Sequence, residues 1–139
     1  MPDIFTYGAE MAPGYAGMIA ETQFKDAASR RVETAAGIGY GLAVTRGTGA
    51  DQVRLGGTQF VGISVADHAH GDRYDQGDVG AFLRKGTIWV TASTAVTAGQ
   101  AVTFTAATGV IGNALAVTIP DAVFETSGAS GDLVRVYLG

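Results

Sequence analysis

A chain of 139 residues is long enough for one domain with a sizeable core, and a second domain is not expected. Hydrophobic residues make up 47% of the chain and exclude a wholly disordered protein, while 21 glycines, about double the usual share, indicate many turns. The net charge of −4, with only nine lysines and arginines, argues against a nucleic-acid partner. The absence of cysteine excludes disulfides and thiolate metal sites.

The charged fraction is low for a soluble domain, at 16% against about 25%. The cores of protein interfaces are depleted of charged residues, so this composition favours a protein that assembles with partners. The N-terminus lacks the basic and apolar regions of a signal peptide, and no window approaches the ~18 apolar residues that a membrane span needs. We therefore expect synthesis in the cytoplasm and no membrane partner.

The first 20 residues are apolar and follow no helical or strand period. An apolar irregular segment has to lie against something, whereas a polar one would be expected to be disordered. We predict an N-terminal arm over residues 1–20 and one β-domain over residues 21–139. The arm either reaches a neighbouring subunit or closes one end of its own domain. Its candidate interface residues are Ile4, Phe5, Tyr7, Met11, Tyr15 and Met18.

Residues 22–36 are the only segment with fair helix propensity, because their apolar residues fall near a 3–4 spacing. The apolar members are mostly alanine, and no convincing cap opens the segment. A strand over residues 28–33 is therefore preferred.

From residue 40 onwards, short runs of alternating apolar and polar residues are separated by glycine-containing turns. This pattern is typical of a sandwich, jelly roll or barrel, and the spacing that builds a parallel sheet through crossover helices is missing. We predict a single-domain antiparallel β-sandwich, jelly-roll-like, with Gly86 breaking two strands and Pro120 starting a corner. The predicted strands are 40–45, 52–55, 60–65, 78–84, 87–91, 100–105, 110–111, 114–119, 123–127 and 133–138.

The densest polar cluster, residues 67–78, holds both histidines and four carboxylates. On an extended strand His68 and His70 would share a face and could bind zinc with Asp72, or the carboxylates could hold calcium. The alternative is a solvated loop, which the Gly, Asp and Arg content favours. The spacing matches neither an EF-hand nor a metalloprotease helix, so we predict no metal and no cofactor.

The chain lacks a nucleophile elbow and a phosphate loop, and we predict no catalytic residue and no enzymatic activity. A carbohydrate- or receptor-binding β module is the alternative from another class. It would need Tyr40, Tyr74, Trp89 and Tyr137 to form a stacking platform on one sheet face. Such residues more often fill a core or an interface.

Six segments of the sequence, taken in their order and spacing, span most of the chain and form a recognisable pattern. They are PGYAGMIA at 13–20, FVGI at 60–63, the stretch 74–90, VTAGQAV at 96–102, AVFETS at 122–127 and LVRV at 133–136. On these pieces the chain resembles the structural cement, or decoration, proteins of tailed-phage capsids.

The resemblance implies an all-β protein on the outer surface of the virion that clamps neighbouring major capsid protein subunits, with no catalysis. It also implies self-association, as a homo-dimer or a homo-trimer, at capsid symmetry axes. Trp89 lies in one of the matching pieces and joins the six arm residues as a candidate interface residue. A clip that spans several subunits fits this role, because each contact raises the effective concentration of the next.

Overall fold

The computed structural model describes residues 15–67, 69 and 71–139, and this part of the chain contains strands and no α-helix. It accordingly has no helix that is long and apolar enough to cross a membrane. The strands are β1 (Ile19–Val32), β2 (Ile38–Gly39), β3 (Ala43–Arg46), β4 (Gln52–Arg54), β5 (Phe60–Ser64), β6 (Arg73–Tyr74), β7 (Val79–Thr91), β8 (Ala101–Phe104), β9 (Ile111–Gly112), β10 (Val117–Phe124) and β11 (Leu133–Leu138).

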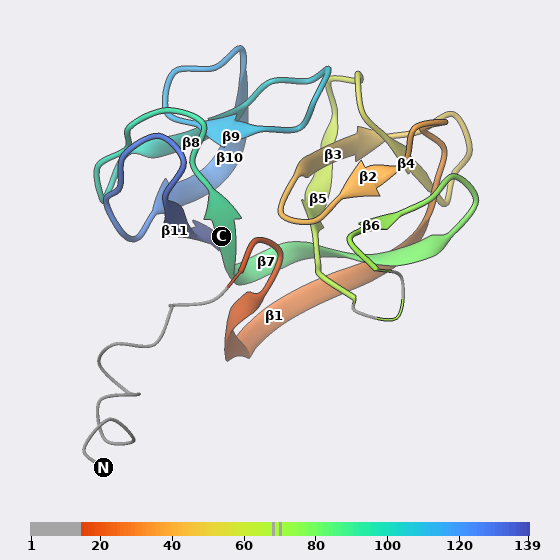
Figure 1. Ribbon diagram of the computed structural model, residues 1–139, viewed down its shortest axis with the longest axis horizontal. Helices are drawn as coiled ribbons and strands as arrows, with labels where there is room; N and C mark the ends of the chain where they lie inside the picture. Colours follow the sequence, from red (N-terminus) through yellow and green to blue (C-terminus); the bar gives the residue numbers. More distant parts are fainter. Residues whose placement is uncertain (1–14, 68, 70) are drawn as a thin grey trace.

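Nine of the described strands form two rings that share β7, while β2 and β6 pair with each other in a separate two-stranded sheet. In the first ring β1 pairs with β4, β4 with β3, β3 with β5, β5 with β7, and β7 again with β1. The second ring runs from β7 through β11, β10 and β8 to β9, and a bridge between Ala92 and Ile111 closes it. Figure 1 shows the first ring on the right, the second on the left and β7 passing between them. Closure leaves few free strand edges for uncontrolled pairing.

The all-β prediction is confirmed. The pairing is antiparallel except between β1 and β4 and at the Ala92–Ile111 bridge, which are the contacts that close the two rings. The jelly-roll arrangement is compatible with these pairs and stays a prediction, as does the division into an arm and a single domain. The preferred strand over residues 28–33 lies mostly within β1, and the helix considered for residues 22–36 is wrong.

Two strands are longer than the sequence predicts. Gly86 does not end a strand. It lies within β7 at a positive φ of 125°, and the pairing register of β1 shifts beside it. Pro120 does not separate two strands either, since β10 continues through it with Asp121 at φ 59°. Both irregularities bend a strand without ending it, as bulges do.

Each ring contributes to its own buried apolar cluster. Adjacent strand residues point to opposite faces, so Phe82 of β7 packs in one cluster and Leu83 in the other. The shared strand therefore joins the two cores. The first-ring cluster is Val32, Ile38, Val44, Val53, Tyr74 and Phe82. The second-ring cluster includes Val90, Phe104, Ile119, Phe124, Val134 and Val136, with Ala43, Ile63 and Leu83 from first-ring strands.

Candidate functional site

The outward side of the second ring carries exposed apolar side chains. Along β11, Val134, Val136 and Leu138 are buried, so the alternating residues Arg135 and Tyr137 face outward. Tyr137 is 39% exposed, and Val123 of β10, its direct register partner, is equally exposed. Directly opposed side chains on one sheet face pack against each other. These two residues form an apolar patch on the surface.

Trp89 and Arg135 continue this surface onto β7. They are register partners, and the guanidinium carbon of Arg135 lies 5.8 Å from the centre of the indole ring. This is a cation–π contact. Glu125 also approaches Arg135, with 4.0 Å between Oε1 and Nε. We call the surface made by Trp89, Val123, Glu125, Arg135 and Tyr137 the outer face.

A tight turn over residues 15–18 is fastened beside the outer face. The amide of Gly17 donates to the carbonyl of Trp89 at 2.8 Å, and the amide of Trp89 donates to the carbonyl of Met18 at 2.9 Å. The turn is closed by the amide of Met18, which donates to the carbonyl of Tyr15 at 3.0 Å. Tyr15 is 44% exposed. The turn therefore places the start of the described chain next to Trp89.

Gly17 fixes this turn, and Gly17→Ala is expected to destabilise the protein by about 2–4 kcal/mol. The residue has a φ of 84°, and an added Cβ would lie 2.8 Å from Cβ of Tyr40 and 2.9 Å from the amide nitrogen of Ala66. Gly99→Ala is the matched control, because Gly99 has a similar φ of 94° with open space around it. Chemical denaturation should show a clearly larger loss for Gly17→Ala. Equal losses would mean that the close packing at Gly17 contributes nothing.

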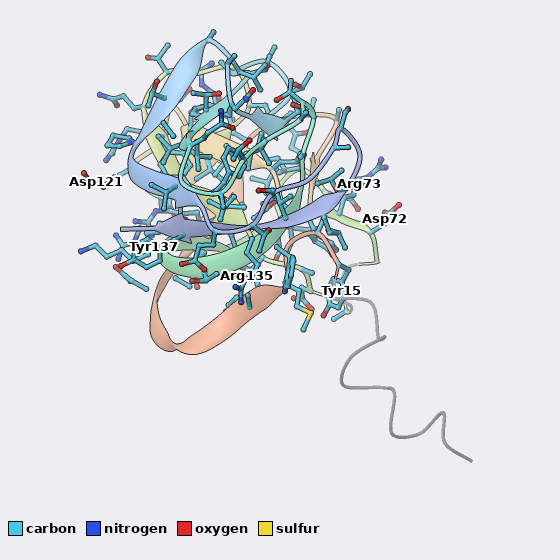
Figure 2. All side chains as sticks on the ribbon, turned by 90° about the vertical axis from the view of Figure 1, so that its left-hand side faces the viewer. Tyr15, Asp72, Arg73, Asp121, Arg135 and Tyr137 are labelled. Carbon is cyan, nitrogen blue, oxygen red and sulfur yellow. The ribbon has the colours of Figure 1, made fainter. Side chains whose placement is uncertain are left out.

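The structure brings together three of the seven predicted interface residues. Tyr15, Met18 and Trp89 meet at the turn through the backbone hydrogen bonds described above. Figure 2 shows the labelled side chains of Tyr137, Arg135 and Tyr15 in that order from left to right across the lower half of the view. The other predicted interface residues lie outside the described residues, and they are Ile4, Phe5, Tyr7 and Met11.

Val123, Glu125 and Arg135 are the outer-face residues that the sequence did not single out. The signal was present in β11, where Arg135 and Tyr137 occupy the outward phase of an alternating strand. Val123 could not be assigned to this face from the sequence, because its partner Tyr137 is set by the pairing of β10 with β11.

The four aromatic residues considered for a sugar platform do not share a surface. Tyr74 is buried and packs edge-on against Tyr40, with ring centres 5.3 Å apart. The Tyr74 hydroxyl donates to the carbonyl of Val65, and the Tyr40 hydroxyl to that of Asp67, both at 2.6 Å. Burial raises the pKa of both phenols. Tyr74 is part of the first-ring cluster and Tyr40 packs against it, whereas Trp89 and Tyr137 lie on the outer face.

The carboxylates of the loop 67–78 hold the loop's own turns. An oxygen of Asp78 accepts from the amide of Asp75 at 2.8 Å, and an oxygen of Asp67 accepts from that of Ala69 at 3.0 Å. Asp75 also pairs with Arg73 at 3.1 Å. Such contacts are typical of a polar loop. Among the described residues, which do not include His68 and His70, no three side chains are grouped to hold a metal ion.

The fold and the outer face together are typical of a structural module that works by assembly. The chain matches the family of structural cement proteins (E217 gp24/Pam3 gp6) over residues 5–139. It therefore belongs to this family of phage capsid proteins, and it has a structural, capsid-associated cement role. The resemblance to structural cement proteins, inferred from the order of the sequence segments, is confirmed.

A solved structure of a phage capsid supports the fold. The chain is similar to one in the structure of the capsid of Myoviridae phage XM1, with 17% identity and a TM-score of 0.73, over 94% of this chain and 92% of that one. A second similar structure is the head fiber gp8.5 N base of bacteriophage phi29, with 14% identity and a TM-score of 0.49, over 84% and 95% of the two chains. No curated protein sequence matches the chain.

Proposed function

We propose that this protein binds the outer surface of its phage capsid and clamps neighbouring major capsid protein subunits, without catalysing a reaction. The observation that carries the proposal is the outer face, where Tyr137 and Val123 are exposed next to the Trp89–Arg135 pair. Tyrosine, tryptophan and arginine are the residues that most often dominate binding energy at protein interfaces.

The position of the turn 15–18 supports a second contact through the N-terminal arm. The turn is fixed to Trp89, so Tyr15, where the described chain begins, lies beside the outer face. The segment that precedes Tyr15 in the sequence contains Ile4, Phe5, Tyr7 and Met11, which are suited to filling apolar pockets on a partner. Two linked contacts give far tighter binding than either alone, because the second forms at high effective concentration.

Self-association, as a homo-dimer or a homo-trimer at the symmetry axes of the capsid, is part of the same proposal. A clip that joins capsid subunits gains from having two or three identical binding surfaces, since each copy can hold a different subunit. The low charged fraction of 16% supports a chain that buries surface against partners.

Co-sedimentation with purified capsids of the parent phage that lack this protein tests the proposal. We expect saturable binding at a fixed ratio to the major capsid protein. A variant lacking residues 1–11 should keep the wild-type melting temperature and bind more weakly; a large fall in melting temperature would show instead that the arm closes its own domain. Absence of binding to both immature and expanded capsids would contradict the proposal, and a glycan array would then test the carbohydrate-binding alternative.

A further inference from the structure

A cleft of about 200 Å³ lies at one end of the first ring, and all five strands or their adjoining turns reach it. Openings of this kind at the end of a strand ring are common places for ligand sites. The cleft is lined by Arg30 of β1, Arg46 of β3, Gln52 of β4, Phe60 and Val61 of β5, and Arg84 of β7. Three of the nine cationic residues of the chain therefore meet at one opening. We call this cleft the arginine mouth.

Strand periodicity explains why the three arginines converge. Each lies two residues from a core residue on its own strand: Arg30 from Val32, Arg46 from Val44 and Arg84 from Phe82. Side chains two residues apart on a strand lie on the same face, so each arginine is on the face of its strand that also carries the first-ring core residue. The sequence shows these arginines as scattered, and only closure of the ring brings them together.

The arginine mouth holds more positive charge than its own carboxylates neutralise. Among the residues that the structure describes, no carboxylate pairs with Arg30 or Arg46. Within the described part of the chain, the Arg30 guanidinium donates to the neighbouring carbonyl of Ser29, at 2.9 Å. The chain as a whole has a net charge of −4, so this concentration of cations runs against its overall charge. Guanidinium groups gathered in this way are suited to binding an anion.

Arg84 shows which anion the mouth can accept. Its Nη2 atom donates to both carboxylate oxygens of Asp26, each at 2.9 Å. Both side chains are a little under half exposed, so the pair contributes little to stability and can exchange for another carboxylate at low cost. The planar guanidinium matches a carboxylate, and Arg30 and Arg46 have the same group available.

A second cleft of about 430 Å³ continues from the mouth, and it shares Phe60, Val61 and Arg84 with it. Beyond these it is lined by the apolar residues Ile119, Pro120 and Leu138 and by polar residues that include Thr118 and Asp121. The two clefts form a groove with a cationic end and an end of mixed polar and apolar character. An extended peptide with carboxylates at the cationic end is complementary in charge to the arginine mouth.

We propose that the arginine mouth is a carboxylate-binding site that holds an acidic segment of the major capsid protein. The identity of the partner rests on the proposed function, whereas the carboxylate chemistry rests on the mouth itself. Nucleic acid is disfavoured because the net charge of −4 repels a long polyanion and the small mouth has Phe60 and Val61 in its lining.

The first test uses a fluorescent peptide of glutamates, with the same length of glutamines as its control. The full-length protein should bind the glutamate peptide saturably at low salt and lose it at high salt. Arg30→Gln and Arg46→Gln should each weaken binding about tenfold. Arg46→Lys should lie between wild type and Arg46→Gln, because lysine keeps the charge but loses the two-pronged geometry.

Arg73→Gln is the matched control, since Arg73 is an exposed arginine of the loop 67–78 outside both clefts. Equal weakening by Arg73→Gln, or equal binding of the two peptides, would overturn the site. Stronger competition by a short DNA duplex than by the glutamate peptide would overturn it in favour of nucleic acid.

The second test measures capsid binding by the Arg30→Gln/Arg46→Gln variant. We expect a loss of at least about tenfold at an unchanged melting temperature. If the wild type binds capsids and this variant binds equally well, the capsid segment is the wrong partner while the proposed function stands. If the wild type binds the glutamate peptide through these arginines but does not bind capsids, the proposed function and the partner fail together, and the carboxylate site remains.

Discussion

The Tyr137→Ser variant is expected to bind capsids at least about tenfold more weakly than the wild type, with a melting temperature that hardly changes. The side chain is 39% exposed on the outer face, so its loss opens no cavity in the core. An aromatic anchor at the centre of an interface contributes about 2 kcal/mol or more, which corresponds to more than a tenfold change in affinity. Co-sedimentation over a range of protein concentrations measures the affinity.

A pair of valines provides the matched control for the outer face. Val123 faces Tyr137, and Val79 at the start of β7 is 53% exposed outside that face. Both substitutions remove the same apolar groups, so they differ only in position. Val123→Ser should weaken capsid binding because Val123 lies on the outer face, whereas Val79→Ser, outside that face, should leave binding unchanged. Equal weakening by the two would indicate a general effect of surface apolarity, and no effect of Tyr137→Ser or Val123→Ser would remove the outer face from the capsid interface.

Trp89 is a less suitable position for this test. Its backbone holds the turn 15–18, and its ring lies under the guanidinium of Arg135. Trp89→Ala would remove the contact with Arg135 as well as the partly exposed ring, so a loss of binding could not be assigned to the ring alone. Tyr137 and Val123 separate binding from folding because their outward side chains contribute mainly to the surface.

Strand positions could be predicted from the sequence because alternation is a local signal. The run at β11 is recognisable from Val134, Val136 and Leu138 alone, and the structure has this strand where the pattern indicates it. The errors occur at Gly86 and Pro120, which usually interrupt strands. Here the neighbouring strands continue to pair on both sides of each residue, and long-range pairing outweighs the local preference.

Ring closure and the surfaces that depend on it could not be predicted. The parallel pair between Arg31 of β1 and Gln52 of β4 closes the first ring, and no local pattern in the sequence predicts this pairing. The arginine mouth exists only because of that closure. At the outer face and the adjoining turn, the family resemblance and the apolar composition predict Trp89, Tyr15 and Met18 as interface residues. Their contact with one another comes from the hydrogen bonds of the turn, which composition does not encode.

The two cores should unfold together, and Phe82→Ala and Phe124→Ala test this. Phe82 is fully buried in the first-ring cluster and Phe124 is almost fully buried in the second-ring cluster. Truncating a buried phenylalanine costs about 3–5 kcal/mol, through lost burial and the cavity that remains. Each variant is therefore expected to lower the melting temperature by roughly 10 °C or more in calorimetry.

Cooperativity is expected because β7 belongs to both rings and presents Phe82 to one cluster and the adjacent Leu83 to the other. Loss of the first-ring core leaves that shared strand without half of its packing, so the second ring cannot keep its native form alone. Both variants should shift one single transition, and Val79→Ala, at an exposed position of the same strand, should leave it in place. Two separate transitions, each lowered by only one of the phenylalanine variants, would show instead that the rings are independent domains joined by a common strand.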